Sequence, residues 1–292
     1  MARTLLVTGA AGKLGRLTIE ALIGSTDDKI VAGSRDPAKL ADLAARGVEL
    51  RRIDFDDDAS LDSGFAGVDR LLIVSTDAVD RPGRRLEQQQ RAVAAAHKAG
   101  VKHIVYTSMP KPEPGSAIVF AADHFGTEQA IKASGLSYTI LRVSWYQENL
   151  LMSLPNALKT GQWFSAAGDG KVSHVAREDV ARAAAAALAS PASASETYDI
   201  TSDEAFTTEE IAALAAKATG RPLQVVHVSD GQLIAGLQAH GVPAPMAAFI
   251  ACFDTNTRLG GMTPPTDAVR KLTGRAPRKL ETYLTEHASD FV

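Results

Sequence analysis

The chain has a single cysteine, Cys252, few aromatic residues and no long apolar run. One cysteine excludes an intrachain disulfide and a cysteine-based metal cluster, which makes the reducing cytoplasm the expected compartment. The apolar run at residues 5–7 is too short for a signal peptide. The densest apolar stretch, residues 181–189, is too short to cross a bilayer. The sequence therefore predicts neither a membrane protein nor a secreted disulfide scaffold.

Charge of one sign is also lacking. There are 31 Lys and Arg residues against 34 Asp and Glu residues, so the formal net charge is −3. This balance gives no electrostatic surface for nucleic acid or for an anionic membrane. No cluster of histidines or carboxylates has the spacing of metal ligands, and no G-x-S-x-G sequence of a hydrolase is present. We therefore expect no metal centre and no serine hydrolase.

The first half of the chain alternates short apolar runs with helical patterns. The runs are apolar on both faces and are separated by crossovers, as in a parallel sheet that helices bury. The sequence therefore predicts an α/β fold with a Rossmann-type, doubly wound parallel sheet. Strands are expected at 5–7, 30–32, 48–53, 71–74, 103–106 and 138–141, and helices at 14–23, 37–46, 84–98 and 123–133.

After Trp145 the pattern changes to helices with isolated strands at 198–201 and 223–228. Thr207 followed by Glu210 is typical of a capping box, and Ser229 is a second expected helix cap. These features predict a dinucleotide-binding domain over 1–145 and a smaller, mostly helical lobe over 146–292. Part of the segment 165–200, the helical pattern at 176–189 above all, is able to return to the first sheet.

The strongest local motif is the sequence TGAAGKLG at residues 8–15, between the first strand and the first helix. Gly9 permits a tight turn, Gly12 a close approach of the backbone to a pyrophosphate, and Gly15 the packing of helix on strand. The N-terminus of the helix then offers free N–H groups to the phosphates. The alternative is a glycine-rich turn without a ligand. The cofactor-binding residues predicted here are Gly9, Ala11, Gly12, Lys13, Leu14 and Gly15.

The residues that follow the second strand indicate which cofactor is bound. Arg35 follows it, and a guanidinium binds a phosphate through two hydrogen bonds. Lys39 lies one helical turn further along the chain and Lys13 lies in the first loop, whereas Asp36 offers a carboxylate that binds an unphosphorylated ribose instead. We expect NADPH, with NADH as the second possibility, and the alternative for Arg35 is a solvated loop charge.

Polar residues also follow the third, fourth and fifth strands. Asp54 is expected to accept the adenine amino group and Phe55 to pack near the ring; the alternative is that this acidic loop caps the next helix. Because ligands bind at the carboxyl ends of parallel strands, the short polar residues after the next two strands are expected along the cofactor. Turn formation is their alternative role. These residues are Ser75, Thr76, Tyr106 and Thr107.

Six segments together resemble the NmrA-like group of atypical short-chain dehydrogenases: TGAAGKLG, SRDPAK at 34–39, AGVKHIVYTS at 99–108, SGLSYTILR at 134–142, WYQENL at 145–150 and SAAGDGKV at 165–172. They look most similar to a quinone-reductase branch next to the dye reductases. The resemblance implies NADPH in a Rossmann domain and two-electron reduction of quinones without flavin. It also places Trp145 and Tyr146 at the substrate pocket. Val143 stands where that branch has asparagine, which leaves the preferred substrate open.

The chain lacks the Tyr-x-x-x-Lys pair of ordinary short-chain dehydrogenases. By resemblance to the lignan and isoflavone reductases, His124 lies near the place of a catalytic lysine. His124 and Ser108 are the residues predicted to deliver a proton, with water as the third source. The alternative for His124 is a partly exposed helix histidine that touches the cofactor amide.

Loss of that pair also fits a protein that binds NADP(H) and regulates a partner without turnover. A third possibility is a reductase of azo or triphenylmethane dyes. In each enzymatic case the expected partner is a small aromatic acceptor, and the chain is expected to be a monomer or homodimer. The apolar residues Met246, Phe249, Ile250 and Phe253 fall at helical spacing. They are expected in the core of the lobe, with a subunit contact as the alternative.

Overall fold

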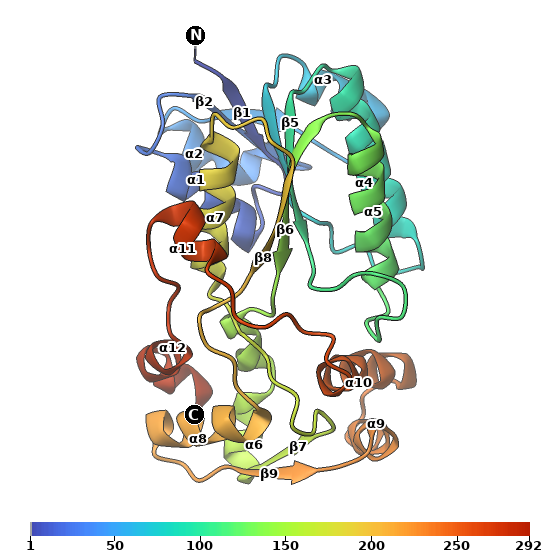
Figure 1. Cartoon of the computed structure of the whole chain (residues 1–292), viewed down its shortest axis with the longest axis vertical. Helices are drawn as coiled ribbons and strands as arrows, with labels where there is room; N and C mark the ends of the chain where they lie inside the picture. Colours follow the sequence, from blue (N-terminus) through green and yellow to red (C-terminus); the bar gives the residue numbers. More distant parts are fainter. Residues whose placement is uncertain (1) are drawn as a thin grey trace.

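The computed structural model describes residues 2–292, and its main feature is a seven-stranded parallel sheet (Figure 1). The strand order is β3-β2-β1-β4-β5-β6-β8 and every neighbouring pair is parallel. This order confirms the predicted Rossmann-type sheet, whose connections reverse direction between β1 and β4. The strands are β1 (Thr4–Val7), β2 (Lys29–Ser34), β3 (Glu49–Arg52), β4 (Arg70–Ile73), β5 (His103–Ser108), β6 (Ser137–Val143) and β8 (Glu196–Ile200).

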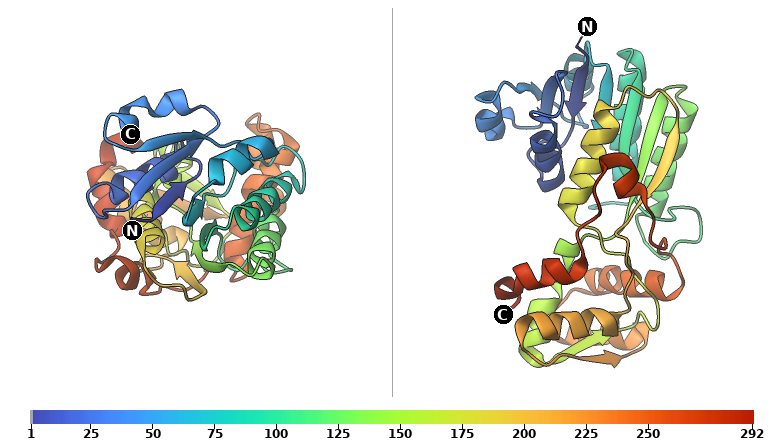
Figure 2. Two further views of the ribbon diagram at one scale, coloured as in Figure 1. Left: turned by 90° about the horizontal axis from the view of Figure 1, so that it is seen from above. Right: turned by 60° about the vertical axis from the view of Figure 1, so that its left-hand side comes forward.

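Helices cover both faces of the sheet (Figures 1 and 2). In β1, Leu5 and Val7 pack into the core beside α1 and α7, whereas Leu6 packs into the core on the opposite face. This alternation explains why the strands are apolar on both faces. One face carries α1 (Lys13–Leu22), α7 (Arg177–Ala189) and α11 (Ala268–Thr273), and the other carries α3 (Asp58–Phe65), α4 (Arg84–Lys98) and α5 (Ala121–Ala133).

The carboxyl ends of the strands point toward a smaller lobe (Figure 1). This lobe has its own core around Leu154, Ile211 and Tyr283 and a two-stranded parallel sheet of β7 and β9. Thr207 and Ser229 both form the expected capping boxes. The elements of the lobe are η2 (Gln147–Met152), α6 (Leu154–Thr160), β7 (Gln162–Ser165), α8 (Thr208–Thr219), β9 (Gln224–His227), α9 (Asp230–Ala239), α10 (Ala244–Arg258), α12 (Leu280–Glu286) and η3 (Ala288–Phe291).

Two sequence predictions of local structure need correction. The helix expected at 37–46 is a 3₁₀ turn, η1 (Pro37–Leu40), followed by the single turn of α2 (Ala41–Ala44). The strand expected to stand alone at 198–201 is β8, which pairs with β6 at the edge of the main sheet. The segment at 176–189 contains α7, which packs on α1 and on β4 of the main sheet.

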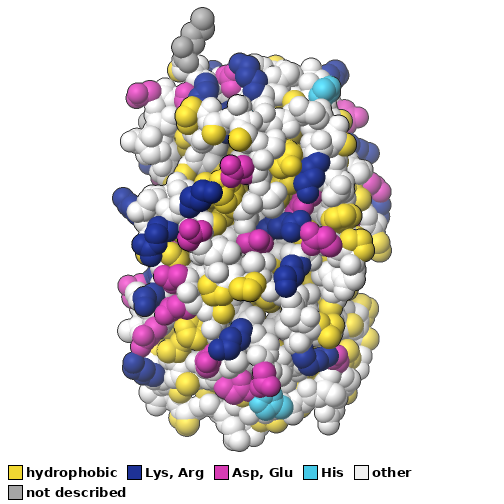
Figure 3. Space-filling view, in the orientation of Figure 1, with side chains coloured by type: hydrophobic (Ala, Val, Ile, Leu, Met, Phe, Trp, Pro, Cys, Tyr) yellow, Lys and Arg dark blue, Asp and Glu magenta, His cyan; other side chains and the backbone are white. Residues whose placement is uncertain are grey.

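Charges of both signs are interspersed on the face of the molecule in Figure 3, and no patch of one sign forms there. Among residues 2–292, no helix is long and apolar enough to cross a membrane. Nor do the described residues contain a group of three or more His, Cys, Asp or Glu side chains that could hold a metal ion.

Candidate functional site

The glycine motif forms a narrow turn between β1 and α1. Gly9 has a φ of +63°, and the N–H of Gly12 donates to the Gly9 carbonyl at 2.9 Å. A Cβ on Gly15 would lie 2.4 Å from the Gly9 oxygen, so no side chain fits between helix and turn. Among residues 2–292 no side chain caps the start of α1, and its first N–H groups remain available. This turn therefore fits a diphosphate, which needs close backbone donors and no intervening side chain.

The other residues predicted to bind the cofactor at this turn differ in their exposure to solvent. Ala11 and Lys13 are exposed, so both can face a ligand. Leu14 is buried in the core under α1, which leaves only its backbone for a nucleotide.

At the end of β2, Arg35 and Asp36 differ in the contacts that they make within the chain. The Asp36 carboxylate accepts from the N–H of Ala38 at 3.2 Å and caps η1, and it lies 3.9 Å from the Lys39 ammonium. Arg35 is exposed, and no carboxylate within residues 2–292 pairs with it. A guanidinium without a carboxylate partner suits a phosphate, and the contact of Arg35 with the cofactor stays a prediction.

Asp54 and Phe55 follow β3. One Asp54 oxygen accepts from the N–H of Asp56 at 3.1 Å, while Asp57 is the residue that caps α3. Of the acidic residues in this loop, Asp57 therefore caps the next helix, as the alternative interpretation expected of the loop. The Phe55 ring is buried in the core on the α3 and α4 side, so the aromatic face is turned away from solvent. The adenine contacts of both residues stay predictions.

Two threonines tie the carboxyl end of β4 to its neighbours. The Thr8 hydroxyl accepts from the N–H of Val74 at 3.0 Å, and the Thr107 hydroxyl accepts from the N–H of Ser75 at 2.9 Å. Thr107 is buried and its hydroxyl is occupied, so this side chain supports the strand end. The Thr76 oxygen is buried, and nothing among the described residues hydrogen bonds to it. It is thus an available polar group at the strand end.

His124 is buried, contrary to the expectation of a partly exposed helix histidine. Its Nε2 lies 3.1 Å from a terminal nitrogen of Arg85, and its Nδ1 lies 2.8 Å from the Tyr106 hydroxyl. An arginine only donates, so Nε2 accepts and Nδ1 carries the proton toward Tyr106. Burial and the Arg85 charge lower the pKa of His124 to about 3, so the ring is neutral at physiological pH. Both nitrogens are engaged, and a role as proton donor stays a prediction.

Ser108 meets a buried carboxylate. Its hydroxyl donates to Glu128 at 2.7 Å, and Arg142 donates to the same carboxylate at 2.9 and 2.8 Å. Glu128 is fully buried, and it and Glu113 hold the pKa of Arg142 above its ordinary value despite desolvation. The Ser108 proton is therefore directed at Glu128, and only the lone pairs of this hydroxyl are free.

The three residues predicted to bind substrate lie in two different environments. Val143 is buried in the core beside α1 and α7, and Tyr146 packs against that core with the Arg177 guanidinium 4.6 Å from its ring centre. Burial raises the pKa of Tyr146 to about 12, so its hydroxyl stays protonated. Trp145 instead packs edge-on against Phe253 of α10, at 5.1 Å between ring centres. Its indole N–H is buried and finds no acceptor among the described residues.

Trp145 belongs to an aromatic cluster between sheet and lobe, made of Phe120, Trp145, Phe249 and Phe253. Phe120 lies 5.9 Å from Phe249 and 6.2 Å from Phe253, measured between ring centres. The spacing of four residues along α10 predicted that Phe249 and Phe253 share a face. Sequence reasoning missed Phe120 and Arg85, because neither lies in a recognisable motif. A positive charge at the start of an otherwise polar helix pattern was the only available signal for Arg85.

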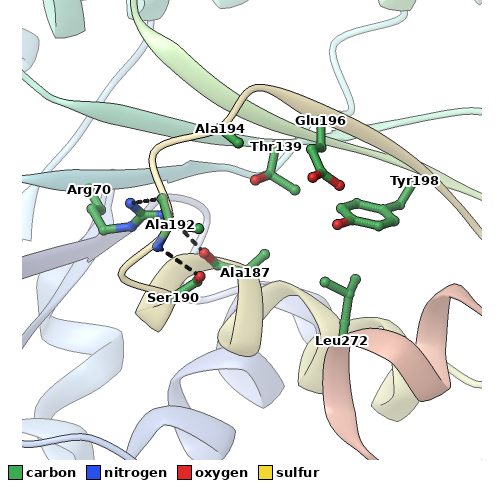
Figure 4. Close-up of a pocket in the computed structure, with 9 residues that line it drawn as sticks. All are labelled: Arg70, Thr139, Ala187, Ser190, Ala192, Ala194, Glu196, Tyr198 and Leu272. Carbon is green, nitrogen blue, oxygen red and sulfur yellow. Dashed lines mark hydrogen bonds between the residues drawn. The ribbon is translucent and has the colours of Figure 1, made fainter.

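Two cavities lie away from these residues. One of about 60 Å³ sits by the amino ends of the strands, where Arg70 points to the end of α7 (Figure 4). Another of about 300 Å³ lies in the lobe beside His227, Asp230 and Arg258. Neither contains a predicted site residue, and ligands of doubly wound sheets bind at the opposite, carboxyl ends of the strands.

Comparisons with known proteins show the family of the chain and similar solved structures. Residues 1–285 match the NmrA-like family. The chain is 36% identical over 275 residues to quinone oxidoreductase 2 of Escherichia coli, covering 94% of this chain and 95% of that protein. A structure of NADPH-dependent quinone oxidoreductase from Escherichia coli, complexed with NADPH, superposes with a TM-score of 0.90 at 35% identity, covering 96% and 98% of the two chains. Triphenylmethane reductase of Citrobacter, complexed with NADP(H), gives 0.89 at 33% identity over 97% and 99%.

Proposed function

Because this chain belongs to the NmrA-like family, we propose that it reduces quinones with NADPH by direct hydride transfer, without flavin. Its general activity is that of an NAD(P)H-dependent oxidoreductase. The observation that carries the proposal is the turn at Gly9–Gly15, where a Cβ at Gly15 has no room and the start of α1 has no cap. The free Arg35 beside it supports NADPH over NADH.

When bound, NADPH supplies a hydride, which is two electrons and one proton, and it leaves as NADP⁺. The quinone gains the hydride and then takes one proton from water, so the products are NADP⁺ and hydroquinone. The residues of the chain hold the reactants for this step. The start of α1 binds the diphosphate, Arg35 binds the phosphate of the adenosine, and Thr8 and Thr107 fix the strand ends that lie between.

Positioning in a dry site supplies much of the acceleration in such a reaction. A quinone accepts a hydride readily, so no activated tyrosine is required. The aromatic cluster supports this acceptor class, because Trp145, Phe120 and Phe253 pack against one another between sheet and lobe, and aromatic side chains stack on flat rings or meet them edge-on. The two relatives reported above are named for a quinone and a triphenylmethane acceptor, both aromatic or planar molecules.

The test is NADPH oxidation by the purified protein with a panel of benzoquinones and naphthoquinones, together with an absorption spectrum for bound flavin. We expect turnover with stoichiometric hydroquinone and no flavin bands. No turnover with any quinone, or activity that requires added flavin, would contradict the proposal.

A second candidate is a redox sensor that binds NADP(H) without turnover. It is favoured by one specific observation: the protons of His124 and Ser108 are both directed at buried partners of the chain. A sensor would bind NADPH or NADP⁺ with measurable affinity and oxidise neither quinones nor triphenylmethane dyes. The same titration and turnover assays therefore separate the two functions.

A further inference from the structure

Arg85 is a buried cation that has no carboxylate partner in the part of the chain that the structure describes. Its side chain lies in the first turn of α4 and is 8% exposed. Its hydrogen bond goes to the neutral His124, and its Nε is buried with no acceptor among residues 2–292. Across that part of the chain no Asp or Glu oxygen lies within 4.0 Å of this guanidinium, whereas the adjacent Arg84 pairs with Asp56 at 3.1 Å and Asp80 at 3.0 Å.

Such a charge is costly to bury. Removal of an arginine from water carries a penalty that a paired carboxylate normally offsets. Asp77 and Asp123 act on Arg85 only through space, and burial lowers the pKa of its guanidinium. The guanidinium nevertheless stays charged at neutral pH. A buried positive charge without a direct carboxylate contact at this place indicates that an anion is present there at some stage of the function.

The surroundings of Arg85 show where that anion belongs. The guanidinium lies 4.8 Å from the ring centre of Phe120, which is a member of the aromatic cluster. Phe120 also packs edge-on against His124, with 5.8 Å between ring centres. The diphosphate site is formed by different elements, at the turn from β1 to α1. Arg85 thus adjoins the proposed acceptor site and is separate from the proposed phosphate contacts.

We propose that the positive charge of Arg85 stabilises the negative charge that the acceptor gains in the aromatic cluster. This inference rests on the proposed quinone reduction. A quinone that receives a hydride carries one negative charge until water supplies a proton, and the oxidised cofactor is the other product. Arg85 acts across the Phe120 ring, so it is a positioning residue for this charge and exchanges no proton.

The expected effect follows from Coulomb's law. At roughly 10 Å and an effective dielectric constant of about 20, one unit charge changes the stability of an anion by about tenfold. The Arg85→Met variant should therefore lower kcat for a neutral naphthoquinone by about tenfold. KM and the Kd for NADPH should stay the same. Arg85→Lys should restore most of the lost activity, because it keeps the charge.

A matched control is available on the same helix. Arg84→Met removes the same charge one residue away, but its guanidinium is partly exposed and paired with carboxylates. We expect this variant to retain wild-type kcat and KM. Equal losses in Arg84→Met and Arg85→Met would overturn the proposal, and so would a weaker Kd for NADPH in Arg85→Met, because the charge would then serve the cofactor.

A binding assay separates this inference from the proposed function. Quenching of tryptophan fluorescence measures the Kd of 2-hydroxy-1,4-naphthoquinone, which is an anion at neutral pH, and of neutral 1,4-naphthoquinone. Arg85→Met should weaken the anion by about tenfold and leave the neutral compound unchanged. This binding assay tests the role of Arg85 even if the wild type turns over no quinone. If Arg85→Met does not fold, Arg85→Gln replaces it, and unchanged binding of the anion in either variant contradicts the role of Arg85.

Discussion

Replacement of Gly15 by alanine tests the contact between α1 and the turn before it. The added Cβ would lie 2.4 Å from the Gly9 oxygen, 2.8 Å from the Gly9 carbonyl carbon and 3.0 Å from the Cα of Ala10. Non-bonded heavy atoms prefer about 3.5 Å or more, so the turn and the helix must separate by about 1 Å. All three atoms are backbone, and no flexible side chain can move aside.

The magnitude follows from that displacement. Overpacking of a well-filled site costs about 1–3 kcal/mol, and we expect Gly15→Ala near the upper end of that range because backbone meets backbone. The same shift moves the N–H groups at the start of α1 away from the diphosphate. A loss of about 1.4 kcal/mol in binding corresponds to a tenfold higher Kd for NADPH, which is the minimum effect we expect.

The assay pairs urea unfolding with a fluorescence titration of NADPH, carried out far below the melting temperature. Gly231→Ala is the control, because a Cβ there meets nothing within 4 Å and the residue lies in α9. Alanine at Gly231 should raise helix stability by about 0.5 kcal/mol and leave the Kd unchanged. A folded Gly15→Ala protein with wild-type Kd would refute the assignment of this turn as the diphosphate site.

Three further predictions concern buried ionisable side chains. Burial lowers the pKa of His103 from 6.5 to about 4, so the unfolded chain binds a proton before the folded chain does, and stability falls as the pH drops from 6.5 through 4. Near pH 5 this difference lowers the free energy of unfolding by about 2 kcal/mol. In urea titrations over this pH range, His103→Gln should lose less stability than the wild type by that amount. Arg70 donates to the carbonyls of Leu188, Ala192 and Ala187 at 2.7, 3.0 and 3.0 Å. Arg70→Met should therefore cost about 3 kcal/mol in urea unfolding while the Kd for NADPH holds, and a wild-type unfolding curve would contradict it. Glu128→Gln leaves Arg142 without its fully buried partner and should lower the free energy of unfolding by about 3 kcal/mol. The control Glu178→Gln, at an exposed ion pair, should lower it by less than about 1 kcal/mol. Equal losses would show that Glu128 is not an essential counter-charge.

The fold was largely predictable because its signals are local. The segment at 71–74 is apolar throughout, as a strand buried on both faces of a sheet requires. The segment at 84–98 has the residue pattern of a helix. The segment at 37–46 misled the prediction, since Pro37 suits the first turn of any helix and the short stretch forms η1 and α2. The place of β8 at the sheet edge was not predictable, because pairing with β6 is a contact between distant segments.

The candidate site was predictable only in part, for the same reason. The glycine turn is a local motif whose spacing encodes its geometry. By contrast, the hydrogen bonds of the buried His124 go to Arg85 and Tyr106, which come from α4 and β5. Neighbourhood in the sequence gave no indication that Val143 and Trp145, two residues apart, lie on different sides of the same segment.

The most direct test of the account is calorimetric titration of the wild type and of Arg35→Ala with NADPH and with NADH. We expect the wild type to bind NADPH at least about tenfold more tightly than NADH, and Arg35→Ala to lose that difference by weakening NADPH alone. Arg46→Ala, which removes a surface arginine paired with Glu20 at 2.6 Å, should behave as wild type. Failure of the wild type to bind either nucleotide, or a preference for NADPH that survives in Arg35→Ala, would contradict the account.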